Sequence, residues 1–415
     1  MRQQQLAIDG GEPVRRDSFP RRILIGHEEV EALHALLEKE RTQGGGFDRY
    51  GGEHVDAYER EFAAYHGVEY ATATSSGTAA IHAALGALRL DIAQEVISSP
   101  ITDPGGVAPI LWCNCIPIFA DVDPATLNID PAAVAARITD KTRAIIVTHL
   151  AGQPADMDPI MEIARQHGLY VIEDCSQAHG AVYRGKLVGT IGHMGAFSLM
   201  GGKHHTAGGQ GGMVITRDES LYWNAKRFAD RGKPFHSTET KNLFLGLNYR
   251  MTEMEAVIGR TQLRKLDNVL ARRRDLVAEI RRQIADLTAI RVGEVIPEAL
   301  PSYWFLLLYV DSKRLTVSKE RFAQAVAAES IPVDPHYDWI IYETPWFRQR
   351  ATYGQSGCPW TCPLYGKEVL YEGTCPHARE GIDAHMVLHI HEGYGAKEIA
   401  DIARALKKVE RAYQR

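Results

Sequence analysis

Hydrophobic positions recur every three or four residues in two long segments of the chain. Within residues 53–66 this spacing is followed by Val55, Tyr58, Phe62 and Tyr65. The period places these side chains on one face of a helix, so the sequence predicts an amphipathic helix here. Residues 263–287 show the same pattern with Leu, Ile and Val on one face and many Arg residues elsewhere. We expect this second helix to link two domains.

Short runs rich in β-branched and aromatic residues alternate with helix-length segments through the first half of the chain. The runs are residues 70–74, 96–99, 116–122, 143–149 and 170–173. Strands separated by helix-length segments predict crossover connections on a buried, mostly parallel sheet with helices on both faces. In such sheets ligands bind at the carboxyl ends of the strands.

The alternation ends near residue 260, which suggests a change of domain. A strand-like run at 303–310, a loop region rich in Gly, Pro, Cys and Tyr at 333–382, and a terminal helix from about Ala396 follow. This order predicts a smaller α+β domain. The predicted division is an N-terminal arm over 1–25, a large α/β domain over 26–265, and the linker helix with the small domain over 266–415.

Length and charge narrow the class of protein. The chain has 415 residues, with 47 basic and 52 acidic side chains, and its net charge of −5 argues against nucleic-acid binding through bulk basicity. Its longest strongly apolar stretch falls far short of the roughly 20 residues that a membrane-spanning helix needs. The N-terminal residues lack the apolar core of a secretory signal. We therefore expect a cytoplasmic protein whose six Cys stay reduced.

The densest group of chemistry-bearing residues lies within residues 170–216. A predicted buried strand delivers Glu173 and Asp174 at its carboxyl end, and Lys203 follows 29 residues after Asp174 in a run of small residues. These features suit a pyridoxal phosphate site, in which the acid keeps the pyridine nitrogen protonated and the lysine forms a Schiff base. Taken separately, the acid could be a helix cap or solvated turn, and the lysine an ordinary surface residue.

A phosphate site is offered by the sequence TSSGTAA at residues 74–80. It follows a predicted strand and precedes a predicted helix at 81–88. Backbone N–H groups at that helix start, with the hydroxyls of Ser76 and Thr78, could hold a phosphate. Simple N-capping by Ser or Thr explains the same motif.

Six motifs, in order along the chain, resemble the DegT/StrS family of sugar and cyclitol aminotransferases, which use pyridoxal phosphate. They are SSGTAA (75–80), PIFADVD (117–123), VTHLAGQPADMDPI (147–160), VIEDCSQAHGA (171–181), FSLMGGK (197–203) and LNYRMTEMEAVIG (247–259). The opening LAIDGGEPVR also resembles the branch that aminates cyclitols and amino-sugar precursors. The similarity weakens beyond about residue 265.

The resemblance implies an aspartate-aminotransferase-like fold of type I, with a mostly parallel central sheet and a smaller C-terminal α+β domain. It implies a homodimer that moves an amino group from glutamate or glutamine to a keto-sugar or keto-cyclitol in amino-sugar or antibiotic biosynthesis. No nucleic acid, membrane or metal ion is implied.

Individual residues match the functional positions of that family. Lys203 matches the Schiff-base lysine, and Asp174 matches the partner of the pyridine nitrogen. The other implied cofactor-binding residues are Gly77 and Thr78 in the phosphate turn, Gln177 beside the ring, Ser198 at the phosphate, and Asn248, which reaches the phosphate of the neighbouring subunit.

Three departures from the family pattern keep two alternatives open. Asp103 occupies the expected cofactor-binding position of a ring-stacking aromatic, and Gln210 replaces the acid in the glycine run after the lysine. We expect the ring face beside Asp103 to be open, filled by Ile101 or contacted by polar groups, and not covered by Trp112. His204 and His205 directly follow Lys203, and related sugar dehydratases carry His in place of the lysine. The alternatives are such a dehydratase, which the retained Lys203 argues against, and a non-catalytic regulatory homologue.

Other residues have weaker functional interpretations. Cys358, Cys362, Cys375 and His377 could bind zinc, although their spacing fits reduced cysteines in a packed loop better. His149 and His179 are expected near strand ends close to the cofactor. Plausible substrate-pocket residues are Arg49, Tyr50, Arg227, Arg231, Lys233 and Tyr337. The absence of a dense basic cluster near the expected site favours a small acceptor over a nucleotide sugar.

Overall fold

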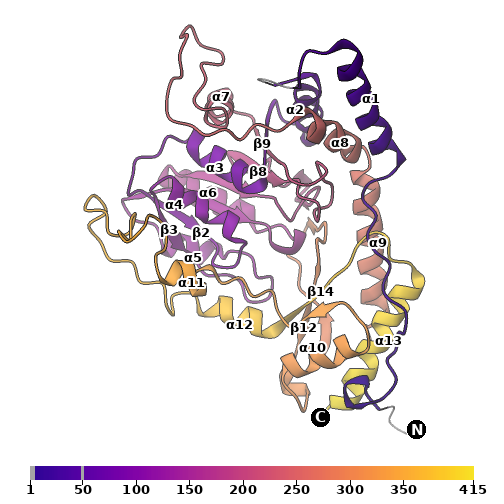
Figure 1. Ribbon diagram of the computed structural model, residues 1–415. Coiled ribbons are helices and arrows are strands. Elements are labelled where there is room, and N and C mark those ends of the chain that lie inside the picture. Colours follow the sequence, from indigo (N-terminus) through magenta and orange to yellow (C-terminus); the bar gives the residue numbers. More distant parts are fainter. Residues whose placement is uncertain (1–4, 48–50) are drawn as a thin grey trace.

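A seven-stranded sheet forms the centre of the larger part of the molecule (Figure 1). The computed structural model describes residues 5–47 and 51–415. The strand order is β1-β9-β8-β5-β4-β2-β3, and β9 alone runs against its neighbours. The strands are β1 (Tyr70–Thr74), β2 (Glu95–Ser98), β3 (Ile116–Phe119), β4 (Thr142–Thr148), β5 (Tyr170–Asp174), β8 (Met194–Ser198) and β9 (Gly212–Thr216). The predicted mostly parallel sheet is confirmed.

Helices cover both faces of this sheet, which explains why its strands read as nearly continuous apolar runs. One hydrophobic core lies under α3 (Gly77–Ala87), α4 (Ala108–Trp112) and α7 (Glu219–Phe228). The other lies under α2 (Glu53–His66), α5 (Pro131–Ala136), α6 (Met157–His167) and α8 (Glu253–Leu263). The predicted helix at 53–66 is α2, which ends where Gly67 adopts a left-handed conformation.

A second, antiparallel sheet has the order β10-β12-β14-β13 and lies in the lower part of Figure 1. Its strands are β10 (Ile290–Val292), β12 (Leu306–Val310), β13 (Val333–Asp334) and β14 (His385–Leu388). Its core includes apolar residues of α9 (Leu266–Gln283), α10 (Lys319–Ala328) and α13 (Ala396–Tyr413). A three-stranded sheet of β11 (Ala299–Leu300), β6 (Val182–Tyr183) and β7 (Lys186–Leu187) joins distant parts of the chain.

The predicted linker helix is α9, which is shorter at both ends than the expected 263–287. α8 ends at Leu263, and α9 begins at Leu266 and ends at Gln283. Between them, Lys265 reaches α1 (His27–Gln43), where its Nζ lies 3.0 Å from a carboxylate oxygen of Glu28 and 2.9 Å from one of Glu29. Tertiary contact with α1 therefore accompanies the break. No helix in the described part of the chain combines the length and apolar content that crossing a membrane requires.

Contacts cross the predicted domain boundaries, and the division itself stays a prediction. Residues of the C-terminal part, including α11 (Pro345–Arg348) and α12 (Pro376–Ala384), pack into the core beside the large sheet through Phe347, Trp360 and Ile382. In the N-terminal arm, Leu6 packs into the core of the small sheet. The arm also anchors to α13, because Arg15 donates to Asp401 at 2.8 Å.

Candidate active site

The site lies where two neighbouring parallel strands end. Asp174 closes β5 and Ser198 closes the adjacent β8, so their carboxyl ends meet at one edge of the sheet. The loop after β8 carries Lys203 and is tied back by two backbone hydrogen bonds, from Leu199 N to Gly211 O and from Ala207 N to Leu199 O. The structure thus places Lys203 and Asp174 at the same edge, and both are buried.

Burial gives these two groups unusual proton affinities. It lowers the pKa of Lys203 from 10.5 to about 8, against the opposing charges of Asp174 and Asp103. Burial raises the pKa of Asp174, while hydrogen bonds from Ser176 and the charge of Lys203 oppose the rise. A lysine with a pKa near 8 keeps an appreciable neutral fraction near neutral pH, which is the nucleophilic form of the amine.

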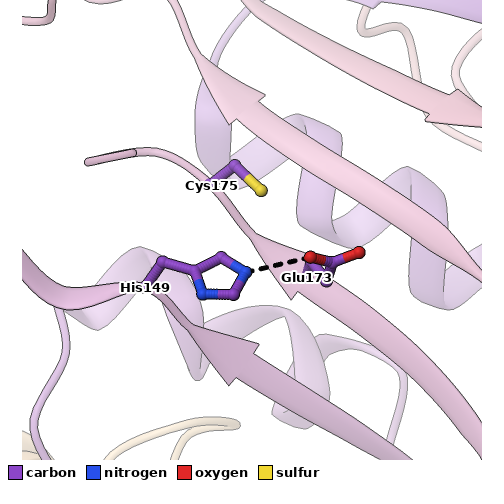
Figure 2. Close-up of side chains that lie close together, drawn as sticks. All are labelled: His149, Glu173 and Cys175. Atoms are coloured by element: carbon purple, nitrogen blue, oxygen red, sulfur yellow. Dashed lines mark hydrogen bonds and ion pairs between the residues drawn. The ribbon is translucent and has the colours of Figure 1, made fainter. Parts of the chain in front are cut away.

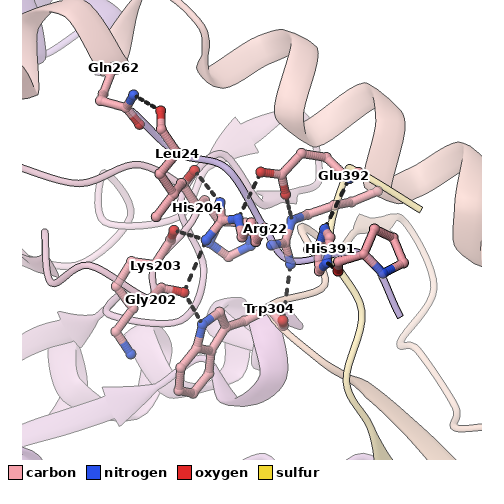
Figure 3. A network of polar contacts seen from close by, with 12 residues as sticks. Arg22, Leu24, Gly202, Lys203, His204, Gln262, Trp304, His391 and Glu392 are labelled. Atoms are coloured by element: carbon pink, nitrogen blue, oxygen red, sulfur yellow. Dashed lines mark hydrogen bonds and ion pairs between the residues drawn. The ribbon is translucent and has the colours of Figure 1, made fainter. Parts of the chain in front are cut away.

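Trp304 contributes the aromatic surface nearest to the lysine amine among the described contacts (Figure 3). The Nζ atom of Lys203 lies 3.6 Å from the centroid of the Trp304 ring. The indole Nε1 also donates to the backbone oxygen of Gly202 at 2.9 Å. Sequence reasoning missed this residue, because Trp304 lies 101 positions after Lys203 in a run that is typical of a strand.

A close-packed cradle forms where α3 begins. Ser76 caps the helix by accepting from Ala79 N at 3.1 Å. A Cβ added to Gly77 would lie 2.6 Å from the Cβ of Ser198, and one added to Gly105 would lie 2.4 Å from Oγ1 of Thr78. Gly77, Thr78 and Ser198, which are predicted to bind phosphate within the subunit, therefore surround one helix start, whose free N–H groups attract an anion.

This cradle and the buried pair fit pyridoxal phosphate. The helix start suits its phosphate, Lys203 suits its aldehyde carbon, and the buried carboxylate of Asp174 calls for a cationic partner such as a pyridinium.

Gln177 connects the loop after β5 to Tyr337 of the C-terminal part of the chain. Its Oε1 accepts from Ala151 N at 2.8 Å, and its Nε2 donates to the hydroxyl of Tyr337 at 3.1 Å. Burial raises the pKa of Tyr337, so this hydroxyl stays protonated. Tyr337 is thus one predicted pocket residue that lies at the site.

The other predicted pocket residues lie elsewhere in the subunit or outside the described residues. Arg227 donates to the backbone oxygens of Phe235 and His236. Arg231 and Lys233 pair with Asp230. Arg49 and Tyr50 lie outside the described residues.

The loop at Asp103 is organised by the acid itself. Asp103 is exposed, and its Oδ1 accepts from Gly105 N at 2.8 Å. Ile101 is fully buried and bridges to Ile340. Trp112 is 60% exposed and packs edge-on against Tyr353. The expectation that the ring face beside Asp103 is open, filled by Ile101 or contacted by polar groups stays a prediction, and the aromatic ring beside the lysine amine is that of Trp304.

Asn248 directly precedes Tyr249, whose backbone oxygen accepts from Ser75 N at 2.7 Å beside this cradle. Asn248 is exposed, and its backbone forms an isolated bridge with Asp230 at the end of α7. Its assignment to a neighbour's phosphate stays a prediction. Gln210 is likewise exposed, in the turn that follows Lys203.

The other acid of the predicted pair, Glu173, faces a buried cluster with His149 and Cys175 (Figure 2). Its carboxylate accepts from the backbone N atoms of Gly189, Ile191 and Gly192 at 2.6–2.7 Å. His149 accepts from Ala155 N at Nδ1, so its Nε2 carries the proton and donates to Glu173 at 3.0 Å. Because the imidazole and the carboxylate are committed to these hydrogen bonds, we interpret the cluster as structural and not as a metal site.

The cysteines considered for zinc do not converge. Among described residues the group of His149, Glu173 and Cys175 alone brings three possible ligand atoms within 4.8 Å of one another. Cys375 is buried with its Sγ 3.9 Å from the backbone oxygen of Phe119. Cys358 and Cys362 are half-buried, and all three are free thiols.

Four buried histidines lie in and behind the lysine loop, and two of them, His204 and His205, directly follow Lys203 in the sequence. They are His66, His179, His204 and His205. Their rings contact one another or share Phe62 and Phe197 as neighbours. Burial lowers the pKa of each, to about 4 for His66 and about 3 for His179. They are therefore neutral near pH 7 and act as packing residues.

A cavity of about 430 Å³ opens beside the lysine loop, between the two sheets. Its lining combines aromatic rings, two carboxylates, three imidazoles and two guanidiniums. The lining side chains include Arg22, Arg273, Trp304, Tyr337, Asp334 and Asp338. Hydroxyl-bearing rings suit this combination, because aromatic faces cover C–H surfaces and carboxylates accept from hydroxyls.

Comparison with known proteins gives consistent matches over most of the chain. A model of the DegT/DnrJ/EryC1/StrS aminotransferase family matches residues 25–407. A GDP-perosamine synthase of Escherichia coli O157:H7 is 34% identical over 299 residues, covering 72% of this chain and 80% of that protein. A putative L-glutamine:3-amino-2,3-dideoxy-scyllo-inosose aminotransferase of Streptoalloteichus tenebrarius is 33% identical over 348 residues, covering 83% and 82%. The X-ray structure of the aminotransferase from Psychrobacter cryohalolentis has a TM-score of 0.82 at 31% identity, covering 95% and 99%.

The buried histidines predict acid sensitivity. Because His66 is neutral in the fold down to about pH 4, the unfolded chain binds its proton first as the pH falls below 6.5. Its contribution to the free energy of unfolding is present above pH 6.5 and declines below it, by up to about 1.4 kcal/mol per pH unit. We expect His66→Phe to make the urea-unfolding free energy less steep in pH between 6 and 5. The exposed control His167→Phe should keep the wild-type slope, and equal slopes in all three proteins would contradict the assignment.

The cradle predicts that Gly77 tolerates no side chain. Gly77→Ala should push the start of α3 away from Ser198, cost about 1–3 kcal/mol of unfolding free energy and weaken phosphate binding at the helix start. Urea unfolding and calorimetric titration with inorganic phosphate measure the two effects. Gly209→Ala is the matched control, since an added Cβ there meets nothing within 4 Å. Wild-type stability and phosphate binding in Gly77→Ala would refute the cradle.

Proposed function

The chain belongs to the DegT/DnrJ/EryC1/StrS aminotransferase family, and we propose that it transfers an amino group from glutamate or glutamine to a keto-sugar or keto-cyclitol. The observation that carries the proposal is the buried lysine of pKa about 8, beside a buried carboxylate and a glycine-lined helix start. We place the reaction in amino-sugar or antibiotic biosynthesis, by analogy with the named relatives.

Pyridoxal phosphate is the proposed cofactor, which when bound supplies an electron sink for the bond broken at the donor α-carbon. In this chain Lys203 would hold it covalently and Asp174 would bind its ring nitrogen. Gly77, Thr78 and Ser198 would surround its phosphate. Gln177, fixed by Ala151 N and Tyr337, would lie beside its ring.

Lys203 is the proposed proton carrier of the reaction. Its Nζ is basic enough to accept a proton and, with a pKa near 8, acidic enough to return it. The face of Trp304 stabilises the ammonium form at 3.6 Å. Because Lys203 and Asp174 are both buried, water has little access to the Lys203 amine that would carry the proton.

The charges lining the cavity favour an uncharged, hydroxyl-rich acceptor. Both lining guanidiniums, Arg22 and Arg273, are already paired with Glu392. Within the described lining, both arginines are therefore already engaged by a carboxylate. Asp334 and Asp338 add carboxylates to the lining, and their partners His389 and His336 are engaged with them in turn. We therefore propose an acceptor closer to an inosose than to a nucleotide sugar.

We propose a homodimer on the basis of exposed apolar residues. The side chain of Ile23 is 84% exposed and that of Leu245 is 91% exposed. Exposed apolar side chains that gather into a patch mark an interaction surface. Further large exposed side chains lie on the same segments, namely Ile25, Val30, Leu37, Leu243, Leu247 and Met254. Asn248 directly follows Leu247, so Asn248 would lie close to a partner subunit that binds this surface.

Lys203 is predicted to carry the cofactor. The purified enzyme should show a visible absorption that borohydride abolishes, with the label on Lys203. Lys203→Ala should lose the label and essentially all amino transfer, whereas Lys186→Ala, which changes an exposed lysine, should keep both. Labelling of Lys186 or Lys233 instead would overturn the assignment. A labelled enzyme that transfers no amine to any keto-sugar or inosose would favour a regulatory homologue.

Sharing of sites between subunits predicts complementation. In a heterodimer of Lys203→Ala and Asn248→Ala chains, one site collects both changes and the other collects neither. Activity should recover to about half that of the wild-type dimer, while each variant alone stays inactive or strongly impaired. Native mass spectrometry verifies heterodimer formation. If verified heterodimers recover no activity, Asn248 acts within its own subunit or not at all.

A further inference from the structure

One side chain of the N-terminal arm reaches the loop that carries Lys203 (Figure 3). Arg22 donates through Nη1 to the backbone oxygen of Lys203 at 2.6 Å and through Nη2 to that of His204 at 2.9 Å. Nη1 also lies 3.3 Å from the backbone oxygen of Gly202. Three consecutive carbonyls of the lysine loop therefore face one guanidinium.

The opposite edge of this guanidinium is held by the C-terminal part of the chain. Arg22 Nε donates to one carboxylate oxygen of Glu392 at 2.7 Å, and Arg273 Nε donates to the other at 3.0 Å. Burial alone would raise the pKa of Glu392, but the charges of Arg273 and Arg22 lower it overall. The carboxylate is therefore ionised and binds both arginines as a charged group.

The contacts then close into a ring around the lysine. Arg273 Nη1 donates to the backbone oxygens of Tyr303 and Trp304 at 2.7 and 3.0 Å. The Trp304 indole donates a hydrogen bond to Gly202 O, and the face of its ring lies against the amine of Lys203. The same set of hydrogen bonds thus fixes the backbone of the lysine and the aromatic surface beside its amine.

The arm is anchored on both sides of Arg22. His391 Nε2 donates to the backbone oxygen of Pro20 at 2.9 Å, and Gln262 Nε2 donates to that of Leu24 at 2.7 Å. These contacts hold the arm against the C-terminal part and against α8, so Arg22 is delivered to the loop from a fixed backbone.

We propose that Arg22 is a positioning residue that holds the lysine loop so that the Lys203 amine stays buried against Trp304. The inference rests on the proposed role of Lys203. A guanidinium suits this task because its planar set of N–H groups can bind a carboxylate on one edge and carbonyls on the other, which an ammonium cannot do in one plane. Without it, the loop carbonyls lose their donor and the amine gains access to water.

The proposal is tested by titrating the amine itself. In the full-length chain freed of cofactor, the rate at which acetic anhydride modifies Lys203 is followed against pH by mass spectrometry. The wild-type rate should rise around pH 8. Arg22→Met should move this inflection up by about one unit, toward that of a solvated lysine. Arg21→Met, which removes an exposed charge from the same arm, should leave it unchanged.

Arg22→Lys separates positioning from simple charge. This variant keeps the positive charge but loses the planar set of N–H donors. An inflection of the Lys203 modification rate between those of the wild type and Arg22→Met therefore supports positioning. A wild-type inflection in Arg22→Lys, together with a shift in Arg22→Met, would show that charge alone acts and would overturn the proposal. Trp304→Phe keeps a ring and removes the donor to Gly202 O, so it should shift the inflection less, in the same direction.

Folding and the proposed function are checked separately. Circular dichroism and thermal melting show which variants are folded. If Arg22→Met is not folded, the inflections of Arg22→Lys and Trp304→Phe test the proposal in its place. Wild-type inflections in both would refute the positioning role. Borohydride labelling of the wild type tests the role of Lys203 itself. A missing label would contradict the proposed function, whereas a labelled wild type with no shift in any folded Arg22 variant contradicts this inference alone.

Discussion

Burial of an amine and a carboxylate at the edge of a parallel sheet is the constraint on which the site depends. Parallel neighbours β5 and β8 end at the same edge, which brings Asp174 and the loop of Lys203 together. Taking both groups out of water brings the pKa of the lysine down to about 8 and raises that of the acid. A neutral fraction of the amine is thereby present near neutral pH, which suits the proposed role of Lys203, and the carboxylate favours a cationic partner.

A buried, reactive lysine requires a loop that does not open to water, and the surrounding chain meets this need from three directions. Behind the loop lie neutral histidines and the aromatic core around Phe62 and Phe197. Beside it lies Trp304, fixed through Arg273. Across it lies Arg22 of the arm, held by Glu392. The arm and the C-terminal part are therefore components of the site and not separate appendages.

Glu173 and Asp174, which are adjacent in β5, lie in different environments because successive side chains of a strand point to opposite faces of the sheet. Asp174 faces the candidate active site. Glu173 is turned into the interior, where three backbone N–H groups and His149 satisfy its carboxylate. That hydrogen bonding fixes the turn at residues 189–192, directly before β8 begins at Met194. One residue of the acid pair thus lies at the candidate active site, and the other supports part of the scaffold.

Periodicity and local motifs were enough to predict the parallel sheet, the helix at 53–66, and the strand end and turn that carry Asp174 and Lys203, because these features depend on residues close together in the sequence. The resemblance indicated the family, and its assignment of cofactor residues stays a prediction. Neither source predicted the contacts of Arg22, Trp304 and Glu392, which lie up to 370 positions apart and carry no local signal. The packing of residues 340–382 onto the large sheet was also decided by tertiary contacts, and the break between α8 and α9 coincides with the contacts of Lys265 to α1. Sequence patterns report which face of an element is apolar, whereas only the folded chain determines which distant polar groups must satisfy one another once buried.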